Sequence, residues 1–143
     1  MSRRLDGKMI WVVFLLLWVL MVRVLTGCSV EKENQDKVRD LESTIVGEAD
    51  LPEELKNLIE EKKPAPFKLT YSNDQGLYIV VGYGEQATGG YSISVNELYL
   101  TENSIVIDTE LKGPEKGETV GVEKSYPYIV VQTEYLENPV IFQ

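Results

Sequence analysis

The most constraining feature of the sequence is a series of short β-forming runs, with no helical segment between them, that fills its C-terminal half. Leu77–Tyr83 is continuously apolar, which is typical of a strand buried on both faces. Tyr91–Val95 alternates, with Tyr91, Ile93 and Val95 predicted to face inward, and the strand continues with a bend to Leu100. The other predicted strands are Phe67–Ser72, Ile105–Leu111, Tyr128–Tyr135 and Val140–Phe142. This pattern predicts a mainly β fold, a small antiparallel β-sandwich or barrel.

A short amphipathic helix is predicted over residues 51–63, directly before the strands. Its apolar residues recur at helical spacing and share one face: Leu51, Leu55, Leu58 and Ile59. Asp50 is placed to cap the first turn, and Pro64 ends the helix.

The N-terminal segment has the features of a bacterial secretory signal. Arg3, Arg4 and Lys8 precede an unbroken apolar run, Met9–Val22. The motif Leu25-Thr26-Gly27-Cys28 follows and resembles the bacterial lipobox. In lipoproteins with this motif, the cysteine becomes the mature N-terminus and carries acyl chains. The resemblance therefore implies cleavage after Gly27 and a lipid on Cys28, which would hold the chain on the extracytoplasmic face of a membrane.

One residue departs from the lipobox pattern, because Arg23 lies between the apolar run and the motif. The alternative is a short uncleaved anchor over Met9–Leu25, with Arg23 reaching toward an interface. Cys28 is the chain's single cysteine and stands at the required position, which favours lipidation. The predicted organisation is a signal peptide over 1–27, a flexible tether over 28–50, the helix over 51–63 and an all-β domain over 64–143.

The charge of the chain excludes one class of partner. The sequence has 14 basic and 23 acidic residues; four of the basic and one of the acidic residues lie in 1–27, which leaves 10 and 22, a net charge of −12. Such a surface repels phosphate backbones, so nucleic acid is not an expected partner.

The sequence contains no histidine, so the commonest general base and metal ligand are missing. Its single cysteine permits neither an internal disulfide nor a thiolate cage. Lys124 and Ser125 are adjacent, but neighbours on a strand face opposite sides. We therefore expect no enzymatic activity, no cofactor and no metal site.

The segment from Gly84 to Tyr91 contains a cluster of glycines and has three interpretations. A nucleotide-binding loop requires a helix to follow, but the next residues have a strand period, so no nucleotide is expected. The glycines can alternatively serve only the fold, by supplying positive φ in a long hairpin connection. In the third interpretation the segment is a partner-binding loop, whose candidate residues are Gly84, Thr88, Gly89, Gly90 and Tyr91.

A second candidate loop is Tyr126-Pro127-Tyr128, just before a strong strand. Pro127 cannot donate a ladder hydrogen bond, so it belongs at a strand start or bulge. The tyrosines either fill the edge of the core or form an aromatic ridge beside the first loop.

These segments together resemble the C-terminal domain of the PrcB family, bacterial protease-complex subunits that are often lipoproteins. The matching stretches are Tyr78-Ile79-Val80-Val81 with Gly84-Glu85, Thr88-Gly89-Gly90-Tyr91-Ser92-Ile93, and Tyr126-Pro127-Tyr128-Ile129-Val130-Val131. The resemblance covers residues 77–135 and implies association with an exported protease. There is a fainter likeness to chagasin-type inhibitors of cysteine proteases, in which Thr88 and Gly89 match a Thr-Gly-aromatic loop but Gly90 intervenes before Tyr91.

The sequence thus predicts a surface lipoprotein that binds another protein through residues 84–91 and with the help of 126–128, and the resemblance implies that this partner is an exported protease. The alternative is a structural lipoprotein of the cell envelope or spore coat with no specific protease partner.

Overall fold

The computed structural model describes residues 7–22 and 36–143, which fall in two separate compact units. In the first unit, helix α1 (Gly7–Val22) contains Lys8 and the whole apolar run Met9–Val22 of the predicted signal. No helix in the described ranges is long and apolar enough to cross a membrane. The predicted cleavage and lipidation residues, Leu25, Thr26, Gly27 and Cys28, lie outside the described residues.

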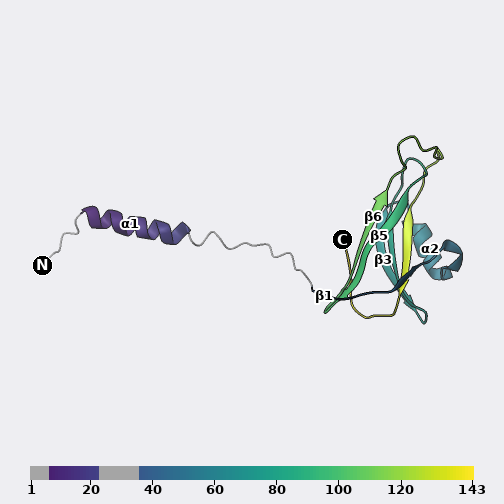
Figure 1. Ribbon diagram of the computed structural model, residues 1–143, viewed down its shortest axis with the longest axis horizontal. Helices are drawn as coiled ribbons and strands as arrows, with labels where there is room; N and C mark the ends of the chain where they lie inside the picture. The colour runs from purple at the N-terminus through teal and green to yellow at the C-terminus, as the bar shows by residue number, and fades with distance from the viewer. Residues whose placement is uncertain (1–6, 23–35) are drawn as a thin grey trace. The chain divides into compact units, whose positions relative to one another are not determined.

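The second unit, Gln35–Gln143, is built on two four-stranded sheets (Figure 1). One sheet has the order β1-β5-β6-β8 and the other the order β2-β7-β4-β3. The strands are β1 (Lys37–Asp40), β2 (Ser43–Ile45), β3 (Pro66–Asn73), β4 (Gly76–Tyr83), β5 (Ser92–Thr101), β6 (Ile105–Lys112), β7 (Tyr128–Thr133) and β8 (Val140–Phe142). All pairs are antiparallel except β6 with β8, which is parallel, so the expectation of a purely antiparallel fold is wrong at this edge. Within residues 36–143 no strand pairing joins the two sheets, so they do not close into a barrel.

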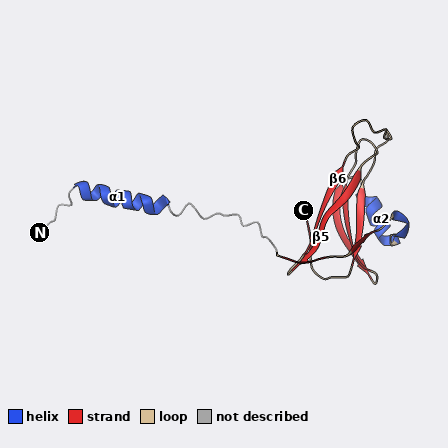
Figure 2. Ribbon diagram, viewed as in Figure 1, coloured by secondary structure: helices blue, strands red, loops and turns tan. Residues whose placement is uncertain are grey.

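The hydrophobic core lies in two layers, one on each face of β4. Between the sheets, Ile79 of β4 packs with Ile107 of β6 and Val131 of β7. On the outer face, Tyr78 and Val80 of β4 pack against helix α2 (Glu53–Lys62). Figure 2 shows α2 on the side away from β5 and β6. The continuous apolar run of β4 is therefore explained, because its side chains are buried on both faces.

Helix α2 lies within the predicted residues 51–63, but its first turn differs from the prediction. Leu55 and Ile59 are buried on the predicted apolar face. Asp50 does not cap the helix; it ends a short 3₁₀ turn, η1 (Glu48–Asp50), and donates its N–H to the carbonyl of Gly47 at 3.0 Å. Pro52 holds the N-cap position and makes no side-chain hydrogen bond to the helix. The fixed φ of proline favours the start of the helix at this residue.

The prediction of a flexible tether over 28–50 is wrong for the strands β1 and β2, because each pairs with a sheet edge. The reason is Leu41, which lies between these strands, is 6% exposed and joins the core between the sheets. The N–H of Leu41 donates to the carbonyl of Leu98 at 3.1 Å, and the N–H of Val46 donates to the carbonyl of Val130 at 3.0 Å. The β-rich unit consequently begins well before the predicted boundary at residue 64.

The predicted bend in the third strand is confirmed as an irregularity of β5. The register against β6 shifts between Val95 and Glu97. Ile93 and Val95 face the core before the shift, and Leu98 and Leu100 face it afterwards. The extra residue keeps apolar side chains on one face of a long strand.

Candidate functional site

Both predicted binding segments lie at the same end of the second unit. β4 ends at Tyr83, β5 begins at Ser92, β6 ends at Lys112 and β7 begins at Tyr128. These strand ends are adjacent, so loop 84–91 and loop 113–127 emerge side by side, at the upper end of the sheets in Figure 1. The two candidate segments therefore form one surface.

The two loops are joined by backbone hydrogen bonds. Gln86 and Ser125 form an isolated antiparallel bridge, with N–H to O distances of 2.8 and 3.1 Å in the two directions. The N–H of Gly89 donates to the carbonyl of Gly121 at 3.1 Å. At the base, the N–H of Tyr83 donates to Pro127 at 3.0 Å. Loop 84–91 and loop 113–127 thus extend the β4–β7 pairing beyond the sheet.

Thr88 makes its hydrogen bonds within this pair of loops. Its carbonyl accepts a hydrogen bond from the Ser125 hydroxyl at 2.6 Å, and its own hydroxyl donates to the Gly89 carbonyl at 3.1 Å. The Thr88 side chain is half-buried. Thr88 therefore connects the two loops in the free protein.

Two glycines of the cluster are required by the fold. Gly84 has a φ of +74°, and a Cβ built there would lie 2.7 Å from Cδ of Pro66. Gly90 has a φ of +85°, and its Cβ would lie 2.4 Å from Cγ1 of Val120. Gly89 has more room. The interpretation that the glycines serve the fold is therefore supported at two of the three positions.

Tyr91 and the 126–128 segment line the base of the loops. The Tyr91 ring packs against Gly113, where an added Cβ would lie 3.5 Å from its Cε1 atom. Lys63 Nζ lies 5.8 Å from the centroid of the Tyr126 ring, and Tyr128 packs into the cluster around α2. Burial raises the pKa of the Tyr128 hydroxyl, and nearby Glu48 and Glu60 raise it further. The Tyr126-Pro127-Tyr128 segment thus connects the loops to α2.

An ion pair also connects the loops. Lys124 Nζ lies 2.6 Å from a carboxylate oxygen of Glu85. The hydrogen bond to this carboxylate raises the pKa of the Lys124 ammonium. Both side chains are exposed, so the pair contributes orientation more than stability.

The sequence predicts residues 126–128 as part of the site but not residues 113–125 of the same loop. The sequence draws attention to Ser125 only through its neighbour Lys124, whereas in the structure the Ser125 hydroxyl donates to the Thr88 carbonyl. No sequence motif contains Val122, which is 91% exposed. The only sequence signal was the alternation of Val120 and Val122 around a glycine, and the pairing with loop 84–91 depends on strand topology.

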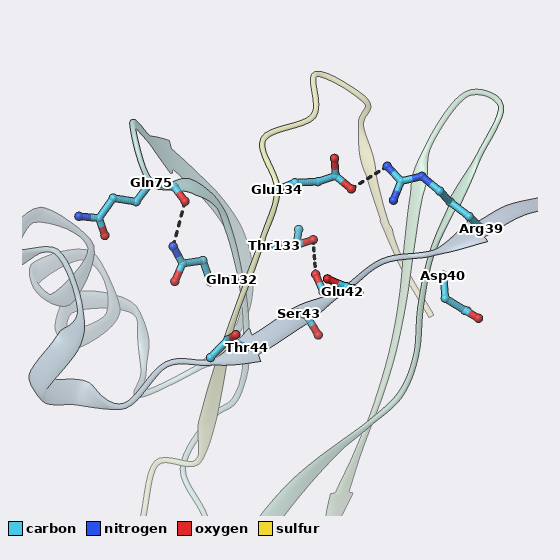
Figure 3. Close-up of a pocket in the computed structure, with 9 residues that line it drawn as sticks. All are labelled: Arg39, Asp40, Glu42, Ser43, Thr44, Gln75, Gln132, Thr133 and Glu134. Atoms are coloured by element: carbon cyan, nitrogen blue, oxygen red, sulfur yellow. Dashed lines mark hydrogen bonds and ion pairs between the residues drawn. The ribbon is translucent and has the colours of Figure 1, made fainter.

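A polar cleft of about 1010 Å³ lies near the opposite end of β4, where Gln132 and Thr133 pair with its first residues (Figure 3). Four of its nine side chains are bonded to one another or to backbone. Arg39 pairs with Glu134 at 2.6 Å, and Gln132 Nε2 donates to the Gln75 carbonyl at 3.0 Å. Among the described residues, no group of His, Cys, Asp and Glu is arranged to hold a metal ion.

Comparison with known protein families gives a match over part of the chain. The family model described as PrcB C-terminal matches residues 77–134. This stretch runs from β4 to the end of β7 and contains both loops. No curated protein matches the chain, and no solved structure matches it.

Proposed function

Residues 77–134 match the PrcB C-terminal family model, and from this premise we propose that the chain is a non-catalytic accessory subunit that binds an exported protease. The contact is made by the surface formed where loop 84–91 meets loop 113–127. The protein either stabilises or restrains its partner there. The family suggests a role related to a protease complex, while the partner and the loop assignment are our proposal.

The observation that carries this proposal is the Gln86–Ser125 bridge. A binding loop that is ordered before it meets its partner loses less conformational entropy on association. Backbone bonds at Gly89 and Tyr83 hold the same two loops at two further points. The family match includes every one of these contacts.

We further propose that the protein works at the extracytoplasmic face of a membrane, held by a lipid on Cys28. The support is the Leu25–Cys28 motif after an apolar run that is helical in the structure. Several acyl chains give stable anchoring where one chain gives only reversible binding. The net charge of −12 for the mature chain opposes direct adsorption of the folded unit to anionic lipid.

The absence of catalysis is part of the same proposal. The sequence has no histidine. Lys124 is held by Glu85, and the hydroxyl of Ser125 is directed to the Thr88 carbonyl. This neighbouring pair therefore makes structural contacts and is not arranged as a base and a nucleophile.

The test is crosslinking and pull-down of the full-length protein from its native membrane. Thr88→Arg places a long charged side chain where the loops meet, and Thr44→Arg is the control on exposed β2. We expect wild type and Thr44→Arg to recover the same exported protease and Thr88→Arg to lose it. Circular dichroism and thermal unfolding establish that each variant is folded. Equal recovery with Thr88→Arg, or no protease with wild type, would contradict the proposal.

A second candidate function is a structural role in the cell envelope. It is favoured by Gly84 and Gly90, whose positive φ and close neighbours account for these glycines without a partner. A structural protein would recover no particular protease and would tolerate folded Thr88 variants. The same pull-down therefore separates the two functions.

A further inference from the structure

The residues of loop 84–91 that sequence reasoning assigned to a partner are largely engaged inside the protein. The Thr88 carbonyl accepts from Ser125, the Gly89 N–H donates to Gly121, and Gly90 lies against Val120. Tyr91 packs against Gly113. This loop supports its neighbour and leaves few unsatisfied groups for a partner.

Loop 113–127, in contrast, carries an exposed apolar side chain, that of Val122. Val122 is 91% exposed, more than any other large apolar side chain in residues 36–143; the next is Ile45 at 65%. Val120, two residues earlier, is half-buried against Gly90. The chain bends at residues 122 and 123, directly after Gly121, and this bend separates the half-buried Val120 from the exposed Val122. The fold holds Val122 out in solvent.

The residues that flank Val122 in the sequence are held by contacts with loop 84–91. Gly121 accepts a backbone bond from Gly89, and Lys124 pairs with Glu85. Ser125 forms the bridge with Gln86. An exposed apolar side chain on a held loop has the properties of an anchor that fills a pocket in a partner, because little entropy is lost when it docks.

The charges around Val122 indicate what surrounds that pocket. Residues 113–125 contain three glutamates and two lysines, and one of the lysines, Lys124, is already paired with Glu85. Glu118 accepts the N–H of Glu115 at 2.9 Å, which keeps its carboxylate on this loop. Glu123 is next to Val122 and exposed. An acidic rim is complementary to a basic one, which would also speed association.

We propose that Val122 is the residue that contacts the partner, and that it inserts into a small apolar pocket bordered by lysine or arginine on the partner protein. The proposal rests on the proposed function and refines it: loop 113–127 makes the contact, and loop 84–91 holds it in place.

The test measures the affinity of full-length protein variants for the protease that wild type recovers. Val122→Ala removes the apolar contact and Val122→Glu adds a charge. Val38→Ala is the matched control, since Val38 is a valine, is 61% exposed and lies on β1 at the opposite end of β5. We expect Val122→Ala to bind about tenfold more weakly, Val122→Glu to lose binding, and Val38→Ala to match wild type. Unchanged thermal unfolding is expected for all three, because both valines are exposed.

Two further readouts address the basic border. Neutralising the rim with Glu118→Gln and Glu123→Gln should slow association, and added salt should reduce the difference from wild type.

If Val122→Ala binds as wild type while Thr88→Arg does not, loop 84–91 itself makes the contact; this overturns the inference and leaves the proposed function standing. If the Gln variants associate as fast as wild type, the basic border is wrong. If wild type recovers no protease, both proposals fail.

Discussion

Gly90 and Gly117 adopt nearly the same backbone conformation, with φ values of +85° and +87°, in very different surroundings. A Cβ at Gly90 would meet Val120 and Pro114, whereas a Cβ at Gly117 would meet nothing within 4 Å. The pair separates two effects that usually occur together, the strain of a positive φ and the clash with a neighbour.

We predict that Gly117→Ala lowers the free energy of unfolding by about 1 kcal/mol, from backbone strain alone. Gly90→Ala should cost clearly more, since Val120 must also move. Urea unfolding of both variants measures the difference. Equal losses would mean that the contact between Gly90 and Val120 is not tight in solution.

The Ser125 hydroxyl gives a second prediction for single residues. Ser125→Ala removes its hydrogen bond to the Thr88 carbonyl but leaves the backbone bridge to Gln86. The loss should be about 1 kcal/mol, expressed as faster amide hydrogen exchange at Gly89, and Ser125→Thr should restore protection. Exchange that is unchanged in Ser125→Ala would show that backbone bonds alone hold the loops.

At the level of elements, the sequence predicts strands well where side chains alternate or form an apolar run. β3, β4, β6 and β8 lie within one residue of their predicted bounds. β1 and β2 could not be predicted this way, because Lys37–Asp40 and Ser43–Ile45 are short, mostly polar and exposed, and they form strands only by pairing with β5 and β7. The sequence offered residues 126–128 as a ridge beside loop 84–91, but the backbone pairing of loop 84–91 with residues 121 and 125 was not predictable, because it follows from the β4–β7 pairing.

Leu41 provides the test of this missed region. Leu41→Ala should lower the free energy of unfolding by about 2–4 kcal/mol, because the side chain is buried in the core between the sheets. Val38→Ala, three residues earlier and exposed, should change it by less than about 0.5 kcal/mol. Chemical denaturation measures both. A negligible effect of Leu41→Ala would restore the interpretation of this region as a tether.

For the whole molecule, the proposed lipid anchor makes attachment to the membrane depend on one residue, Cys28. We predict that the protein made in its native cell partitions into the detergent phase and that Cys28→Ser moves it to the aqueous phase. Mass spectrometry of the mature N-terminus measures the acyl chains directly. Detergent partitioning that persists in Cys28→Ser would favour the uncleaved anchor over Met9–Leu25.

The direction in which β1 joins its sheet has a mechanical consequence for a protein anchored in this way. Lys37 pairs with Thr101 at one end of β5, and loop 84–91 leaves from Ser92 at the other end. A pull between the anchor and a partner held at the loops therefore runs along β1 and β5. Such a load shears the hydrogen bonds of β1 together instead of peeling them apart one by one. In the proposed arrangement, tension from a bound partner would therefore act along the stronger direction of the N-terminal strand β1.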